Sequence, residues 1–200
     1  RIVGNPDLWK EYWQDPAVRH YYFIGKDNIP FHSIIWPSIL MGYGGLTLPY
    51  DIPANEYLMY KGGKFSKSRG GAIDMPTVLS KYDSDVVRFY LSIVMPDTHD
   101  SEFSWEDFQT KINTELVGNL GNYCHRCLSF TKKNFGSVPE TDGLKDEVAQ
   151  EIDRAFKEYS EYMQSCDFKK AIKVIMDLSH FGNRYFDSMK PWALVKTDKD

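Results

Sequence analysis

The pattern of apolar and polar residues divides this chain into two parts. In the first part, residues 20–24 are apolar, β-branched or aromatic and end at Gly25, which predicts a strand running into a turn. Residues 30–41 carry apolar side chains at helical spacing and stop at a run of glycines. Residues 55–60 read as another strand. The order strand, helix, strand predicts the end of a parallel α/β sheet.

After Asp74 the pattern turns helical. Pro76 suits a first helical turn, and Ser84 with Asp85 predicts the cap of a helix over residues 86–95. We therefore expect three regions: the C-terminal part of a Rossmann-like domain at residues 1–72, a connecting helical region at 73–104, and a helical bundle at 105–200.

The bundle is predicted from three amphipathic stretches. Ser104, with Asp107 three residues later, is a capping-box-like start for a helix that reaches about residue 135. Two further helices are expected over about 144–166 and 168–189, and three antiparallel helices of this length form a bundle. The apolar stripe of the first helix consists of Leu116, Leu120, Tyr123, Cys127 and Phe130.

Composition restricts the class of protein. Hydrophobic residues make up 42% of the chain and aromatic residues 15%, which favours a packed core over disorder. The net charge of −4 argues against a generic polyanion binder, so a nucleic acid would have to be recognised by specific contacts. No apolar run approaches the roughly 20 residues of a membrane helix. We expect a cytoplasmic protein without a membrane partner, and a chain that begins within a longer protein.

The three cysteines do not predict a disulfide framework. Cys124 and Cys127 form a C-x-x-C within a predicted helix, and Cys166 stands apart. Since no second pair follows at zinc-site spacing, we expect buried helix thiols and no metal ligands, with a metal or redox site as the alternative.

Residues 62–71 contain two lysines, Lys64 and Lys67, with Ser66 between them and glycine pairs on both sides. Ammonium groups and serine hydroxyls on a mobile loop can meet the charge that develops on a leaving pyrophosphate. A solvated basic surface loop explains the same charge pattern equally well.

The surrounding residues favour the first interpretation. Residues 64–68, Lys-Phe-Ser-Lys-Ser, resemble the KMSKS signature of class I aminoacyl-tRNA synthetases, with Phe65 at the usual Met position. Residues 85–91 resemble the Asp-x-x-Arg-aromatic-aromatic-Leu helix that often follows the signature. Phe at position 65 fits the archaeal and eukaryotic branch of the methionine enzymes.

Residues 22–32 resemble the F-x-G/A-K-D-x-x-x-F-H segment of methionyl-tRNA synthetases. Gly25 lets a nucleotide approach the backbone, and the Asp27 carboxylate can accept hydrogen bonds from ribose hydroxyls. The resemblance implies that Phe31 and His32 help form a methionine pocket. Taken singly, Asp27 is more often a helix cap and His32 more often a helix-end histidine than a ligand contact.

In the first bundle helix, Asn119, Asn122 and Arg126 are three and four residues apart and share one face. Asn and Arg read and stack on unpaired bases, although an ordinary polar helix face is the simpler explanation. The stretch resembles the anticodon-binding helix of methionyl-tRNA synthetases, in which Asn122 and Arg126 would read bases. Pro191 and Trp192 resemble the family's Pro-Trp, whose indole supports an anticodon base; Trp192 as core is the alternative.

The resemblance covers nearly the whole chain and implies a methionine–tRNA ligase that uses ATP with Mg²⁺, methionine and methionine tRNA. The implied residues are Lys64 and Lys67 for catalysis; Gly25, Asp27, Lys64, Ser66 and Lys67 for ATP; Phe31 and His32 for methionine; and Asn122, Arg126, Pro191 and Trp192 for the anticodon. The chain contains no His-Ile-Gly-His-type segment, so we expect it to make no adenylate alone. A tRNA-binding module without catalysis and a purely structural helical scaffold remain as alternatives.

Overall fold

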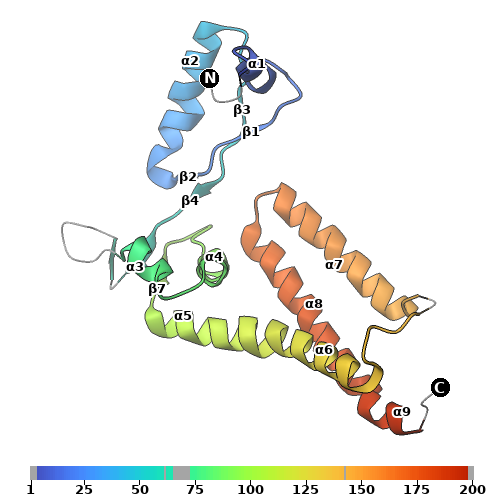
Figure 1. Ribbon diagram of the computed structural model, residues 1–200. Helices are drawn as coiled ribbons and strands as arrows, with labels where there is room; N and C mark the ends of the chain where they lie inside the picture. The colour runs from blue at the N-terminus through green and yellow to red at the C-terminus, as the bar shows by residue number, and fades with distance from the viewer. Residues whose placement is uncertain (1–3, 61, 65–72, 142, 198–200) are drawn as a thin grey trace. The chain divides into compact units, whose positions relative to one another are not determined.

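The computed structural model describes residues 4–60, 62–64, 73–141 and 143–197 (Figure 1). The chain divides into two compact units. The first unit comprises the described residues of 1–71 together with 95–102, and the second those of 72–94 together with 103–200. The three-region division predicted from the sequence stays a prediction.

The helices of the first unit precede and follow its short strands. The expected helix over residues 30–41 is confirmed, and its first turns have π geometry because their backbone bonds span five residues. It ends at Gly44, whose φ of 82° suits a residue without a side chain. The elements are α1 (Leu8–Trp13), η1 (Lys26–Asn28), η2 (Phe31–Ile35) and α2 (Trp36–Tyr43).

Two parallel strand pairs form the α/β part. β1 (His20–Tyr21) pairs with β3 (Pro49–Asp51), and β2 (Ile24–Gly25) pairs with β4 (Ala54–Asn55). The predicted strand over residues 20–24 is therefore interrupted. Pro53, between β3 and β4, has no N–H to donate, although its carbonyl accepts from the Ile24 amide at 3.1 Å.

The predicted strand over residues 55–60 is also divided, because its two ends pair with different partners. β4 pairs with β2, whereas β5 (Leu58–Tyr60) lies between β6 (Gly63–Lys64) and β7 (Ser101–Phe103) in a three-stranded sheet. β5 and β6 are antiparallel, with Met59 opposite Lys64. Gly62, at a φ of 71°, occupies the turn between them, where a residue with a side chain would be strained.

The second unit is helical. α5 (Trp105–Lys111), η4 (Ile112–Gly121) and α6 (Asn122–Phe135) follow one another without a break and form one long helix (Figure 1). Its middle segment has π geometry. The other helices are α3 (Met75–Leu79), α4 (Ser84–Ile93), α7 (Asp146–Gln164), α8 (Phe168–Met189) and α9 (Pro191–Thr197).

Side-chain caps start several of these helices. The predicted cap at Ser104 is confirmed, since its hydroxyl accepts the Asp107 amide at 3.0 Å. The cap of α4 was predicted one residue too late, because Asp83, and not Ser84 with Asp85, accepts the Asp85 amide at 2.8 Å. A carboxylate at Asp83 reaches the same N–H groups from one residue earlier.

Asp107 also ties α5 to α4. Its carboxylate accepts from the Tyr90 hydroxyl at 2.8 Å and from the Lys111 ammonium at 2.8 Å. Burial alone would raise the pKa of the Asp107 carboxyl, but the hydrogen bonds from Lys111 and Tyr90 outweigh it and hold that pKa below its ordinary value. Tyr90 is fully buried and packs edge-on against Phe103 and Phe108.

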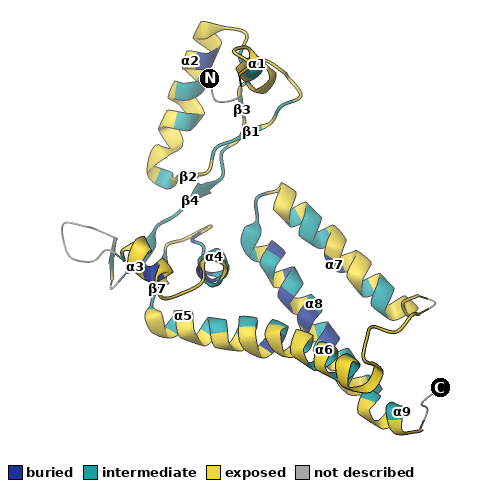
Figure 2. Cartoon of the chain, viewed as in Figure 1, coloured by how far each residue is buried: buried dark blue, intermediate teal, exposed yellow. Residues whose placement is uncertain are grey.

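The predicted bundle is confirmed: α8 packs against α7, η4, α6 and α4, and several of its residues are buried (Figure 2). A side chain at Gly182 would bring its Cβ within 2.6 Å of the Tyr123 ring, so the glycine lets α6 approach α8 closely. Each residue of the predicted stripe is half-buried, namely Leu116, Leu120, Tyr123, Cys127 and Phe130.

The prediction that the cysteines are buried was wrong for Cys124, which is exposed. Cys124 follows a stripe residue, and one helical step turns its side chain about 100° away from the packed face. Cys127 is half-buried, and burial raises the pKa of its thiol.

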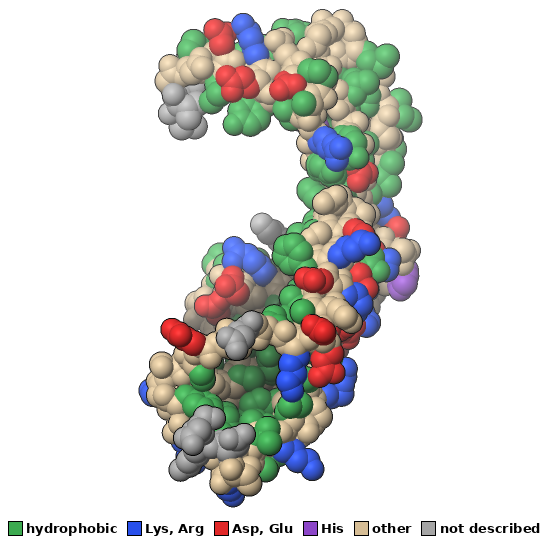
Figure 3. Space-filling model, turned by 90° about the vertical axis from the view of Figure 1, so that its right-hand side faces the viewer, with side chains coloured by type: hydrophobic (Ala, Val, Ile, Leu, Met, Phe, Trp, Pro, Cys, Tyr) green, Lys and Arg blue, Asp and Glu red, His purple; other side chains and the backbone are tan. Residues whose placement is uncertain are grey.

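Hydrophobic side chains also reach the surface, as the green atoms among charged ones in Figure 3 show. Within the described part of the chain, none of the helices has the length and apolar character needed to cross a bilayer.

Candidate functional site

Gly25 ends strand β2. Its φ of −84° and ψ of 154° are extended values that any residue adopts. A Cβ placed there would meet no atom of the described residues within 4 Å. Neither local conformation nor packing against these residues therefore requires a glycine, and a ligand could come close to the backbone at this point.

Asp27 lies one residue into η1 and is exposed. Its Oδ1 accepts a hydrogen bond from the hydroxyl of Tyr57, which follows β4 in the chain. The residue before η1 is Gly25, and no side chain caps that helix. The contact of Asp27 is thus with a neighbouring segment and not with its own helix, which weakens the interpretation as a cap.

Lys26 lies between Gly25 and Asp27 and contacts three residues. Its ammonium donates to Glu56 and to Asp100, the latter at 3.0 Å, and lies 4.3 Å from the centroid of the Tyr57 ring. The hydrogen bonds to Glu56 and then Asp100 raise the pKa of Lys26 to about 12. The backbone amide of Tyr57 and then Lys26 lower the pKa of Asp100.

These contacts make Lys26, Glu56, Tyr57 and Asp100 part of the candidate site, and the sequence interpretation did not include any of them. Lys26 and Tyr57 each offered one signal, because Lys26 lies inside the quoted motif and Tyr57 lies inside the strand predicted over residues 55–60. Asp100 offered none, since it is far from the motif in the chain.

His32 and Phe31 lie in η2. The Nδ1 of His32 is 3.0 Å from the Asn28 carbonyl, which can only accept, so Nδ1 is the donor of this hydrogen bond and Nε2 is the ring nitrogen left for a ligand. The ring of His32 lies 5.6 Å from that of Tyr22, whose hydroxyl accepts from Trp36 at 2.8 Å. Phe31 is 55% exposed, so packing within the unit does not explain its aromatic ring.

The lysine loop is described only at its start. β6 places the backbone of Lys64 opposite Met59. Ser66 and Lys67, which the sequence assigns to phosphate binding, lie outside the described residues, so their roles stay predictions.

In the second unit the predicted polar face of the long helix packs against α8. Asn119 is 3% exposed and donates to the Met176 carbonyl at 3.1 Å. Asn183 of α8 donates to the Asn119 carbonyl at 3.2 Å and accepts from Asn122 at 3.3 Å. Asn119 is therefore buried and hydrogen-bonded to α8 within the bundle, whereas Asn122 is exposed.

Arg126, one turn beyond Asn122, forms an ion pair with Asp187 of α8. The guanidinium carbon lies 4.8 Å from the centroid of the Phe186 ring, and the Phe186 ring lies 6.0 Å from that of Trp192. Asp187 raises the pKa of Arg126, and Arg126 lowers that of Asp187. The two predicted residues Arg126 and Trp192 thus flank the ring of Phe186, a residue that the sequence interpretation missed.

Trp192 is 44% exposed, which does not fit a simple core residue. It follows Pro191, the first residue of α9. α8 ends at Lys190 with a left-handed backbone, φ 46°, which separates it from α9. Asn183 and Asp187 are four residues apart, as are Asn122 and Arg126; this matched spacing was the signal that could have paired the two helices.

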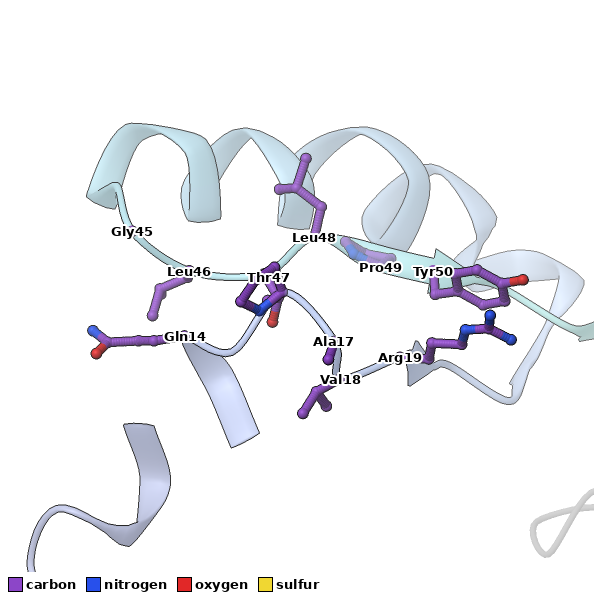
Figure 4. A pocket seen from close by; sticks show the side chains of 11 residues that line it. Gln14, Ala17, Val18, Arg19, Gly45, Leu46, Thr47, Leu48, Pro49 and Tyr50 are labelled. Atoms are coloured by element: carbon purple, nitrogen blue, oxygen red, sulfur yellow. The ribbon is translucent and has the colours of Figure 1, made fainter. Parts of the chain in front are cut away.

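A separate pocket of about 730 Å³ lies in the first unit, between the turn after α1 and the segment before β3 (Figure 4). The guanidinium of Arg19 lies over the Tyr50 ring there, 4.6 Å from its centroid. None of the predicted site residues lines it. Among the residues that the structure describes, no group of three or more His, Cys, Asp or Glu side chains could hold a metal ion.

The fold, the residues at the end of β2 and the residues between the long helix and α8 together point to a class I tRNA synthetase. Residues 1–128 match the tRNA synthetases class I (M), and residues 138–200 match the anticodon binding domain of methionyl tRNA ligase. A solved structure of Mycobacterium tuberculosis methionyl-tRNA synthetase bound by methionyl-adenylate matches with a TM-score of 0.81 at 31% identity, over 98% of this chain and 39% of that one.

Curated relatives narrow the class. The methionine–tRNA ligase of Thermoplasma volcanium is 45% identical over 100% of this chain and 37% of its own length. That of Pyrococcus abyssi is 49% identical over 98% of this chain and 29% of its own length. The chain therefore belongs to the methionyl-tRNA synthetase family of class I tRNA synthetases and spans about a third of the length of these relatives.

Proposed function

We propose that this chain supplies part of the adenylate-forming site and the anticodon-binding helices of a methionine–tRNA ligase. In the first step the methionine carboxylate attacks the α-phosphorus of ATP, which forms methionyl-adenylate and releases pyrophosphate. In the second, a hydroxyl of the terminal adenosine of methionine tRNA attacks the adenylate carbonyl, which forms the ester and releases AMP.

The observation that carries the proposal is the position of Gly25 and Asp27 at the carboxyl end of the parallel pair β2–β4. Nucleotides bind at this edge of parallel sheets. The fold matches a solved structure of a methionyl-tRNA synthetase bound by methionyl-adenylate. Gly25 leaves room for the nucleotide, and Asp27 accepts from its ribose.

The methionine pocket would use Phe31 and His32. The exposed ring of Phe31 offers apolar surface to a thioether side chain. The ring of His32, held by the Asn28 carbonyl, offers one defined polar atom beside it.

Lys64 and Lys67 would stabilise the charge that develops on the leaving pyrophosphate, with Ser66 as an additional donor. Mg²⁺ would arrive with ATP and neutralise phosphate charge.

The anticodon site would be formed by Asn122, Arg126, Pro191 and Trp192. Asn122 is exposed, and Trp192 presents a half-exposed indole near the ring that Arg126 covers. An indole and a guanidinium plane are surfaces on which unpaired bases stack. With a net charge of −4, such specific contacts, and not bulk charge, would bind the tRNA.

Methionine-dependent ATP–pyrophosphate exchange by the full-length protein tests the catalytic part. We expect Lys67→Ala to lower kcat far more than it changes the KM for methionine, since the ammonium acts on charge that exists only in the transition state. Equal losses in both would contradict that role. The 200-residue chain alone is expected to show no exchange, and measurable exchange by it would refute this expectation.

If the chain served only as a tRNA-binding module, Trp192→Ala would weaken tRNA binding and Lys67→Ala would change no measured activity. A structural scaffold would show no preference for a methionine anticodon over another.

A further inference from the structure

Lys26 connects separate segments of the first unit. It follows Gly25 at the end of β2, and its ammonium reaches Glu56, after β4, and Asp100, before β7. One cation thus stands between two carboxylates close to the position proposed for an anionic nucleotide. Without it these carboxylates would repel both Asp27 and the phosphates of ATP.

Tyr57 is held on several sides. Its backbone amide donates to Asp100 Oδ1 at 2.9 Å, and its carbonyl accepts from Ser101 at 3.0 Å. The Lys26 ammonium lies over its ring. Its hydroxyl donates to Asp27 Oδ1. The side chain of Asp27 is therefore connected through Tyr57 to Lys26 and Asp100.

From this array we propose that Lys26 and Tyr57 are positioning residues that hold the Asp27 carboxylate for the ribose hydroxyls of ATP. The inference deepens the proposed function and rests on it. Tyr57 uses one lone pair of Oδ1, which leaves the other sites of the carboxylate, including Oδ2, to accept from the ribose. A carboxylate already fixed in this way loses less rotational freedom when the nucleotide binds.

Charge state and geometry are compatible with this role at neutral pH. Its carboxylate partners raise the pKa of Lys26 to about 12, so the ammonium stays charged. Asp100, whose pKa is lowered, stays ionised. Lys26 and Glu56 each retain about a third of their side-chain exposure, at 31% and 30%, so an ion pair that merely braces the surface is the competing explanation.

Ribose selectivity separates the two explanations. A bracing pair would change stability, or all kinetic parameters together. A positioning role changes how well the enzyme distinguishes ATP from analogues that lack a ribose hydroxyl, because only ATP benefits from a correctly held carboxylate.

The experiment is methionine-dependent ATP–pyrophosphate exchange by the full-length protein with ATP, 2′-deoxyATP and 3′-deoxyATP. The variants are Tyr57→Phe, Lys26→Met and Lys26→Arg. Lys10→Met is the matched control, because Lys10 also pairs with an acid, Asp7 at 2.8 Å, and lies 5.9 Å from a ring centroid, that of Trp9.

We expect Tyr57→Phe and Lys26→Met to raise the KM for ATP and to lower the preference for ATP over at least one analogue by about tenfold, the value of one hydrogen bond to a charged group. The KM for methionine should stay the same. Lys26→Arg, which keeps the charge, should retain most of the preference, and Lys10→Met all of it.

Unchanged ribose preference in both Tyr57→Phe and Lys26→Met would overturn the inference while leaving the proposed function standing. Lack of exchange in the unmodified protein would instead overturn the proposed function and, with it, this inference. Urea unfolding identifies a variant that fails to fold, and Tyr57→Phe, which deletes a single oxygen, then decides the question.

Discussion

Trp192 offers a direct test of the proposed anticodon site. Its indole is 44% exposed, and the centroid of its ring lies 6.0 Å from that of the Phe186 ring. Trp192→Ala removes the surface on which we expect an anticodon base to stack. It leaves Gly25 and Asp27 unchanged, because they belong to the other unit. The variant should therefore separate tRNA recognition from adenylate formation.

The size of the effect follows from the stacking energy. Base–aromatic stacking is worth about 1–3 kcal/mol, which corresponds to about a 5- to 150-fold rise in the KM for tRNA. Because nearly half of the side chain is already exposed, Trp192→Ala should lower the free energy of unfolding by only about 1–2 kcal/mol. Trp192→Phe keeps a stacking ring, so its KM for tRNA should lie between that of the unmodified protein and that of Trp192→Ala.

The assay is aminoacylation of methionine tRNA by the full-length protein, with ATP–pyrophosphate exchange measured in parallel. Trp9→Ala is the matched control, because Trp9 is exposed to nearly the same extent, 43%, and lies on α1 of the first unit. A KM for tRNA within twofold of the unmodified value, or an equal rise in the Trp9 variant, would refute the stacking role.

Three further predictions concern the bundle that carries these residues. Gly182→Ala should destabilise the protein by about 1–3 kcal/mol because its methyl would overlap the Tyr123 ring. Urea unfolding measures this as a lower midpoint at constant m-value. An unchanged midpoint would show that the ring moves aside without cost. Asn119→Ala should cost about 1–3 kcal/mol in unfolding free energy because it removes the buried hydrogen bond to the Met176 carbonyl, whereas Asn119→Asp, tested in parallel, should cost more by burying a charge. The pKa of Asp107 is lowered from its ordinary 3.8, so the stability it contributes is present above that value and is lost as pH falls through the folded pKa. The difference in unfolding free energy between the protein and Asp107→Asn should therefore shrink below about pH 4, and a constant difference down to pH 2 would contradict this.

Local patterns were sufficient for much of the architecture. Helical spacing predicted α7 and α8, and the Ser104 cap needed only a hydroxyl three residues before the amide it accepts. The family was also readable from short segments, because residues 22–32 and 64–68 carry motifs whose spacing is local. These features depend on neighbours within a few residues in the chain.

Strand limits and burial were less predictable. The runs at 20–24 and 55–60 look continuous in sequence, but each changes pairing partner partway along its length. The exposure of Cys124 depends on its position around the helix relative to the packed stripe. The buried hydrogen bond of Asn119 depends on α8, which is far away in the sequence.

The sequence by itself therefore determined the family, the order of elements and the candidate residues, because motif and periodicity are encoded by near neighbours. Only the tertiary structure decided what those residues contact. Asp27 meets Tyr57, Lys26 meets Asp100, and Arg126 meets Asp187 across long stretches of chain. Such pairings arise from how strands and helices pack, and apart from the matched spacing of Asn122 with Arg126 and Asn183 with Asp187 no local pattern carries that information.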